Sequence, residues 1–237
     1  MNEIGSPRRG LHGRVVDELG RRVVGGQWSA GSPLPNEDDL AADLGVSRSV
    51  VREAIKVLQA KGLVEVRPKT GTRVRARRAW HLLDADVVGW LYADLERGDE
   101  LGDLRELHEV RVTIEAAAAR LAAGRRTDEQ LAEIEANERR VEAAWAEPVA
   151  RRAADLDFHS AVVDAADNSL LAHVDALIRV ALEASGTPAD GDSEVARRAT
   201  ALRASVARAI RAGDADAAEA AMSALVQHDW NGTAREG

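Results

Sequence analysis

The sequence predicts an N-terminal winged helix-turn-helix of the α+β class, followed by an all-α helical bundle. Residues 34–74 read as two short helices and then a small hairpin rich in basic residues. Beyond them, apolar residues recur at helical spacing with little sign of strand. The charge divides at the same place. Residues 1–78 carry 15 Lys and Arg against 9 Asp and Glu, a net +6, whereas the remainder carries 17 against 31, a net −14. A basic module joined to an acidic body fits a nucleic-acid reader with a separate control domain.

The composition excludes several classes of protein. The chain has no Cys, so neither a disulfide framework nor a thiolate metal site is possible. No apolar run approaches the roughly 18 residues of a membrane span, and no signal-peptide pattern opens the chain. We therefore expect a cytoplasmic protein that makes no contact with a membrane.

The N-terminal module is expected over residues 7–76. Residues 9–24 carry apolar side chains at helical spacing, and the glycines that follow end this first helix. A second helix is expected to begin after Asn36, a good N-cap residue, and to end at Gly45, which suits a left-handed C-cap. A polar loop with two prolines separates the two helices.

The third helix is expected in SRSVVREAIKVLQAKG, with Ser47 as its cap and Gly62 after its end. Its apolar residues share one face, which leaves the serines and arginines of its first turns on the other. Two alternating runs, LVEVR and TRVRA, then flank PKTG and predict a hairpin.

Residues 77–100 are expected to form a linker with its own helix, and residues 101–232 an all-α domain. The helices expected in this domain span roughly 101–123, 127–146, 149–166, 169–184, 193–212 and 215–230. Glycine, proline and asparagine separate most of them.

These residues resemble a known family. LPNEDDLAADLGVSRSVVREAIKVLQAKGLVEVRPKTGTRV is similar to the winged helix-turn-helix of GntR-family transcription regulators. Three later passages, LGDLRELHEVRVTIEAAAARLAAGRRTDEQL, DLDFHSAVVDAADNSLL and AIRAGDADAAEAAM, resemble the FadR-type effector domain known as FCD. The connector WHLLDADVVGWL is similar to that of members that respond to sugar acids such as galactonate or gluconate.

The resemblance implies a homodimer that binds a near-palindromic operator in double-stranded DNA and is controlled by a small carboxylate. A repressor is expected, with an activator as the alternative. No enzymatic activity is expected, because no complete catalytic set accompanies the DNA-binding module.

The resemblance places the third helix in the DNA major groove. The residues that it implies for DNA contact on this helix are Ser47, Arg48, Ser49 and Arg52. The two arginines lie four residues apart, hence on one face, and arginine is the best donor to guanine O6 and N7. The tip of the wing, Lys69, Thr70 and Gly71, would lie along the minor groove or the backbone.

Two features complicate this interpretation. Arg52 could instead pair with Glu53 or Asp43 on the surface of the module. Asp38 also occupies a position where the family usually has arginine, so a phosphate contact is expected to be lost there. The other possibility is that Asp38 reads a cytosine amino group.

The FCD resemblance implies a divalent metal held by an aspartate, a histidine four residues later and two further histidines. Asp155 and His159 match the first two positions, and their spacing puts both on one helix face. Arg203 and Leu225 occupy the other two, and a guanidinium cannot ligate a cation. His228 lies about one turn beyond Leu225 and is the remaining candidate.

Three accounts of this site stay open. In the first, a zinc-like metal is held by Asp155, His159 and His228. In the second, which we favour, Arg203 takes the place of the metal and binds an anionic effector directly, since its fork suits a carboxylate. In the third, Asp155 and Arg203 form only an internal ion pair beside a buried histidine. The predicted effector-binding residues are Arg111, Asp155, His159, Arg203 and Asn168.

Overall fold

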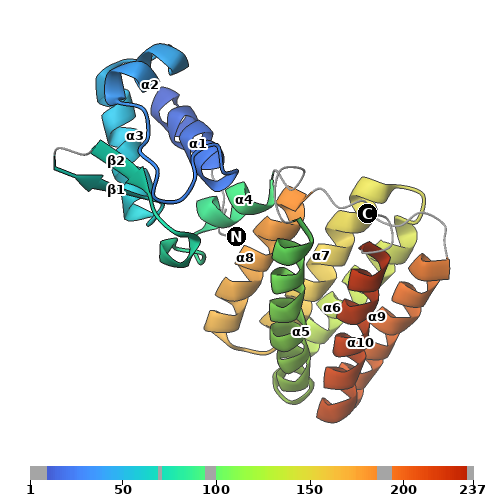
Figure 1. Ribbon diagram of the computed structural model, residues 1–237. Helices are drawn as coiled ribbons and strands as arrows, with labels where there is room; N and C mark the ends of the chain where they lie inside the picture. Colours follow the sequence, from blue (N-terminus) through green and yellow to red (C-terminus); the bar gives the residue numbers. More distant parts are fainter. Residues whose placement is uncertain (1–9, 69–70, 94–99, 186–193, 234–237) are drawn as a thin grey trace. The chain divides into compact units, whose positions relative to one another are not determined.

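The computed structural model describes residues 10–68, 71–93, 100–185 and 194–233. The chain divides into two compact units, Met1–Glu100 and Leu101–Gly237. In its described residues the first unit contains three helices, a hairpin and a short fourth helix, and the second contains helices only (Figure 1). The predicted fold class, a winged helix-turn-helix followed by an all-α bundle, is confirmed.

The first unit begins with α1 (Leu11–Val24), α2 (Glu37–Leu44) and α3 (Arg48–Ala60). The hairpin follows as β1 (Val64–Arg67) and β2 (Gly71–Val74), which pair antiparallel with Val64 opposite Val74. Its core joins the apolar faces of the helices to the base of the hairpin. The fully buried side chains in this core include those of Val16, Leu19, Val51, Leu58 and Leu63.

The turn between α2 and α3 follows the chemistry of its residues. The side chain of Asn36 accepts hydrogen bonds from the backbone N–H groups of Asp38 and Asp39, at 3.0 and 2.9 Å, and so caps α2. Gly45 ends α2 with a φ of 63°, in the left-handed region that glycine enters without steric penalty. This tight turn fixes how α3 leaves α2.

The connector contributes to the first unit. After the short 3-10 helix η1 (Arg77–Ala79), α4 (Ala85–Tyr92) packs against α1. Trp90 is buried in this contact, and a Cβ atom at Gly20 would lie 2.6 Å from its ring. Lys61 is tied to α4 as well, because its Nζ lies 2.6 Å from Asp84 Oδ1.

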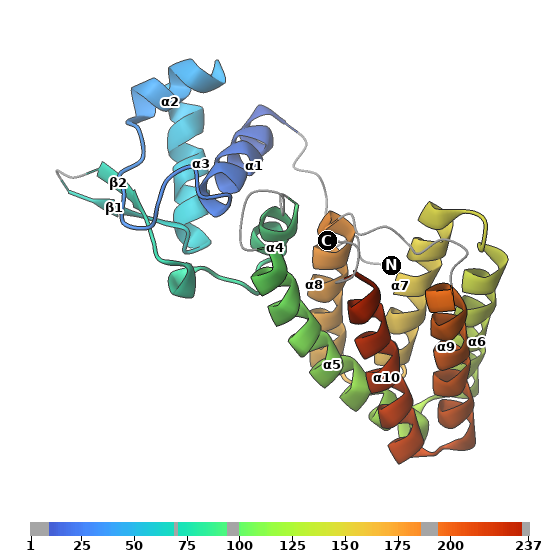
Figure 2. The same ribbon diagram turned by 45° about the vertical axis from the view of Figure 1, so that its right-hand side comes forward.

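The second unit is a bundle of long helices that run side by side in both views (Figures 1 and 2). The helices are α5 (Glu100–Arg125), α6 (Asp128–Ala143), α7 (Pro148–Asp164), α8 (Ser169–Ser185), α9 (Glu194–Ala212) and α10 (Ala215–Thr233). The core is built from many alanines around a few large residues, of which Phe158, Ile134 and Met222 are fully buried. Small side chains let the helices approach closely.

Among the described residues, no helix combines the length and the apolar character that crossing a membrane requires.

Candidate functional site

The first candidate surface lies on α3. One face of this helix buries Val51, Ala54, Ile55 and Leu58 in the core of the unit. The opposite face carries the predicted DNA contacts, which are all exposed. We call this set the reading face: Ser47, Arg48, Ser49 and Arg52. Ser47 stands at the N-cap position of α3, but its hydroxyl hydrogen-bonds to that of Ser49 at 2.9 Å and does not cap the helix.

The two arginines are held by carboxylates of α2. Arg48 Nε lies 2.9 Å from Glu37 Oε2, and Arg48 Nη1 lies 3.2 Å from Asp38 Oδ2. Arg52 Nη2 lies 2.9 Å from Glu37 Oε2. The hydrogen bonds from Arg52 and Arg48 lower the pKa of Glu37 to about 2, so Glu37 is ionised at neutral pH.

The structure corrects the alternative pairing of Arg52. Glu53 pairs with Lys56 at 2.8 Å, and Asp43 pairs with Arg22 at 2.5 Å. Arg52 pairs with Glu37 instead, because α2 and α3 bring the first turn of one helix against the first turns of the other. Asp38 likewise forms an ion pair with Arg48.

The predicted wing is present as the β1–β2 hairpin, but Lys69 and Thr70 at its tip lie outside the described residues. Gly71 begins β2 with a φ of 78°, a conformation that favours glycine. At the base of the hairpin, Arg73 Nη1 donates to the carbonyl of Gly31 at 2.7 Å. This contact ties the second strand to the loop that precedes α2.

The second candidate site lies inside the helical bundle, where charged side chains from four helices meet. We call them the ionic cluster: Arg111 and Glu115 of α5, Asp155 and His159 of α7, Arg203 of α9 and Asp229 of α10. Groups of this kind are rarely buried unless they are paired. Their number and position make this cluster the candidate ligand site of the domain.

Glu115 is the centre of one half of the cluster. Its side chain is 1% exposed, Oε1 accepts a hydrogen bond from Arg111 Nε at 2.7 Å, and Oε2 lies 2.5 Å from His159 Nδ1. Burial alone would raise the pKa of Glu115, but the charges of Arg111 and His159 lower it to about 2. Burial also favours neutral His159, yet the Glu115 carboxylate raises the pKa of this histidine above its ordinary value.

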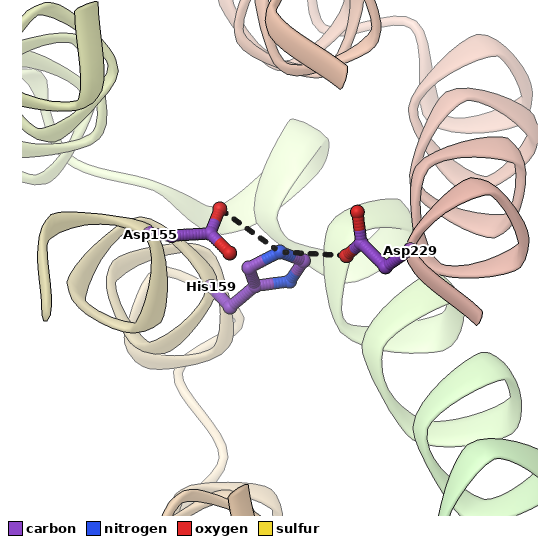
Figure 3. Close-up of side chains that lie close together, drawn as sticks. All are labelled: Asp155, His159 and Asp229. Atoms are coloured by element: carbon purple, nitrogen blue, oxygen red, sulfur yellow. Dashed lines mark ion pairs between the residues drawn. The ribbon is translucent and has the colours of Figure 1, made fainter. Parts of the chain in front are cut away.

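Asp155 and Arg203 form the other half. Arg203 Nε and Nη2 both lie 2.6 Å from Asp155 Oδ1. Figure 3 shows His159 between two carboxylates, with its Nε2 3.8 Å from Asp155 Oδ1 and 3.8 Å from Asp229 Oδ2. These two distances are too long for hydrogen bonds. Within the described residues, His159 Nε2 and Arg203 Nη1 are buried without a hydrogen-bond partner.

Asp229 was missed by sequence reasoning, although a signal for it exists. Met222, Leu225 and Val226 are fully buried, and position 229 continues their helical stripe. Burial and the neighbouring charge of Asp155 raise the pKa of Asp229, so its negative charge is weakened in this environment. The residue predicted in its place was the adjacent His228.

Two predicted residues lie apart from the cluster. His228 Nε2 lies 2.8 Å from the carbonyl oxygen of Val195, so this histidine fastens α10 to the start of α9. The assignment of His228 as a metal ligand is corrected, because the residue that joins Asp155 and His159 within 4.8 Å is Asp229. Asn168 Oδ1 accepts hydrogen bonds from the N–H groups of Leu170 and Leu171, which makes it the cap of α8.

The donor set does not suit a divalent metal. Asp155, His159 and Asp229 bring one ligand atom each within 4.8 Å of one another, the arrangement that a cation site requires. However, Arg203 already binds the carboxylate oxygen of Asp155, and its positive charge opposes a second cation there. A guanidinium supplies no lone pair to complete a coordination shell.

A small cavity of about 50 Å³ adjoins the ionic cluster, and Arg111 and Asp229 belong to both. Its remaining wall is largely apolar and includes His108, which stacks on Trp230 with ring centroids 4.9 Å apart. Typical ligand pockets are larger, at about 300–1,000 Å³. A ligand would therefore have to widen this cavity as it reaches the charged side chains.

The structure combines an exposed arginine pair on a helix-turn-helix, a basic hairpin and a separate helical domain with a buried ionic cluster. These features define a DNA-binding regulator with its own sensing domain. The family model described as "Bacterial regulatory proteins, gntR family" matches residues 11–74, and that of the FCD domain matches residues 106–228. The chain belongs to the GntR family of transcription regulators and carries an FCD domain.

Curated relatives agree with this assignment. The chain is 33% identical over 217 residues to the galactonate operon transcriptional repressor of Escherichia coli, an alignment that covers 90% of this chain and 92% of the relative. It is 35% identical over 173 residues to the Exu regulon transcriptional regulator of the same organism, covering 73% of this chain and 62% of the relative. These relatives are transcription regulators.

Solved structures show the same fold. A Listeria monocytogenes protein, Lar, described as controlling the expression of the agr system, aligns over 97% of this chain and 99% of its own with a TM-score of 0.62 at 19% identity. A GntR protein of Streptococcus agalactiae aligns over 94% of this chain and 100% of its own with a TM-score of 0.52 at 24% identity.

Proposed function

We propose that this regulator is a repressor without enzymatic activity, which binds a near-palindromic operator as a homodimer and is released by a small carboxylate. The observation that carries DNA recognition is the reading face, where two exposed arginines stand on the side of α3 opposite its buried stripe. Each arginine has a side chain more than half exposed. A bidentate arginine–guanine pair contributes about 1–3 kcal/mol of discrimination between bases.

Substitution of Arg48 tests this assignment. Duplexes that bind the wild-type protein are first selected from a random pool, and a selected duplex then serves as the probe. We expect Arg48→Ala to abolish specific binding, while circular dichroism and the mass in solution stay unchanged. Arg14→Ala is the control, because it removes the same charge from an exposed site on α1. Unchanged affinity of Arg48→Ala for the selected duplex would reject the reading face.

The proposal of a carboxylate effector is supported by two buried nitrogens of the ionic cluster, Arg203 Nη1 and His159 Nε2, which lack a hydrogen-bond partner among the described residues. Arg203 Nη1 is a donor, and His159 Nε2 is a donor when the imidazole is charged. Burying a polar N–H group without an acceptor costs about 1–3 kcal/mol, so such groups mark positions where a ligand can bind. An anion between Arg203 and the charged imidazole of His159 would satisfy both nitrogens, and Glu115 favours that charged form because it raises the pKa of His159. We propose that Arg203 occupies the position that a metal would otherwise take and binds the carboxylate directly. Asp155 would hold Arg203, and Arg111 would supply a second positive charge.

Sugar acids are the class to test first, because the galactonate operon repressor is among the relatives of this chain. We expect galactonate to raise the melting temperature, since a ligand that binds only the native state stabilises it. Galactitol, a neutral polyol, is the control for the charge of the carboxylate. Arg203→Gln should abolish the shift. A shift that disappears when a chelator is added would show that a metal takes part and would overturn the direct contact.

A further inference from the structure

Glu37 holds both arginines of the reading face through one carboxylate. Its oxygens accept hydrogen bonds from Arg48 Nε at 2.9 Å, from Arg52 Nε at 3.2 Å and from Arg52 Nη2 at 2.9 Å. In both arginines the Nε side of the guanidinium is therefore occupied. The side that remains for a base is the end of the side chain, formed by Nη1 and Nη2.

The two arginines differ at this end. Asp38 Oδ2 lies 3.2 Å from Arg48 Nη1, one of the two nitrogens that an end-on fork to guanine uses. Within the part of the chain that the structure describes, no hydrogen bond involves Nη1 of Arg52. Arg52 thus faces outward with its end free, whereas Arg48 is held by two carboxylates.

We propose that Asp38 is an intramolecular competitor of DNA at Arg48. Glu37 positions Arg52 for a guanine, and Arg48 contributes fully only when its terminal nitrogens leave Asp38. Removing the carboxylate of Asp38 should therefore tighten binding through Arg48. An exposed ion pair contributes up to about 1 kcal/mol, which corresponds to a gain in affinity of about threefold to fivefold.

The chain offers a matched control for the charge itself. Asp39 follows Asp38 in the first turn of α2 and is also exposed, but among the described residues it forms no ion pair with an arginine. Asp38→Asn and Asp39→Asn remove the same charge from adjacent positions in the first turn of α2. Both residues donate only their backbone N–H to Asn36, so the helix cap survives in each variant.

The experiment measures the affinity of the wild-type protein, Asp38→Asn, Asp39→Asn and Arg48→Ala for a duplex selected by the wild-type protein. Each aspartate substitution is also combined with Arg48→Ala. Asp38→Asn should bind about threefold more tightly than Asp39→Asn. The Arg48→Ala background is measured at low salt, where residual binding is strong enough to quantify. In this background the two aspartate variants should have equal affinity, because Asp38 no longer has Arg48 as a partner. This double-mutant cycle separates the Asp38–Arg48 contact from general charge effects. Thermal melting of each variant checks that the first unit stays folded.

Three outcomes would overturn the proposal. Equal affinities of the Asp38 and Asp39 variants would show that only charge matters. A difference that persists without Arg48 would show that Asp38 acts through another group. Weaker binding of Asp38→Asn would show that the carboxylate itself contacts DNA. The proposal rests on the reading face, but the two fail separately: if Arg48→Ala weakens binding and the aspartate variants are equal, only the competitor is wrong.

Discussion

Replacing Glu115 with glutamine tests whether the ionic cluster holds the second unit together. Glutamine keeps the shape of the side chain, but its NH₂ group cannot accept the hydrogen bond that one of the two partners donates, and Arg111 and His159 lose their shared negative charge. Removing one member of a buried ion pair costs about 3–5 kcal/mol. We expect the lower part of this range, because Asp229 Oδ2 lies only 3.8 Å from Arg111 Nη2 and can approach it.

In a unit of this size each kcal/mol lowers the melting temperature by about 3–4 °C, so the variant should melt about 10 °C below the wild type. The assay is thermal unfolding of the full chain followed by circular dichroism at 222 nm, where helices dominate the signal. Glu109→Gln is the control, because Glu109 lies on the same helix, is exposed and has Arg105 only at 3.9 Å. Equal losses in the two variants would refute the reasoning.

The pH dependence of the same variant reports on His159. Glu115 raises the pKa of His159, so pairing with the charged imidazole contributes stability that is complete below about pH 6.5. That contribution is lost as the pH rises through the raised pKa. The gap between wild type and Glu115→Gln should therefore narrow in alkaline solution. A gap of constant size would mean that His159 does not change its charge over the pH range measured.

Substitutions at Gly62 of the first unit and at Asp229 of the ionic cluster test two separate features. Gly62→Ala should destabilise the first unit by about 2 kcal/mol or more in urea unfolding, because the added Cβ would lie 2.4 Å from the carbonyl oxygen of Ala79. Gly26 is the control, because it has the same φ of 76° but open space around it. Gly26→Ala should therefore show only the smaller loss of stability that comes from the backbone conformation. Equal losses of stability in the two variants would remove the steric explanation. Asp229→Asn should tighten galactonate binding about tenfold in calorimetry, because it removes a carboxylate near Arg111 and His159. Weaker binding would mean that Asp229 contacts the ligand.

The helices could be predicted from the sequence because their signals are local. The expected helix over residues 149–166 is found at Pro148–Asp164, and that over 215–230 at Ala215–Thr233. Apolar periodicity, Asn36 as a cap and Gly45 as a left-handed end each act within one or two turns of chain. The hairpin followed in the same way from two alternating runs around a glycine.

The contacts within the sites depend on distant segments and were less accessible. The pairing of Asp155 with Arg203 was among the accounts left open, since a resemblance supplied both positions. The pairing of Arg52 with Glu37 was missed, because the candidates considered were the nearest acidic residues. Asp229 was passed over for a neighbouring histidine, although one step along a helix turns a side chain by about 100°.

Both candidate sites share a physical arrangement, in which arginine donors are paired with carboxylates of the same chain before a ligand arrives. Arg48 and Arg52 are paired on the surface, and Arg111 and Arg203 are paired in the bundle. A phosphate, a base or a small carboxylate must therefore exchange with an internal acceptor, and its affinity is the difference between two similar interactions. Such a difference changes sharply when the internal carboxylate is removed and only weakly when charge is removed elsewhere. That contrast distinguishes an exchange of partners from simple electrostatic attraction in both units.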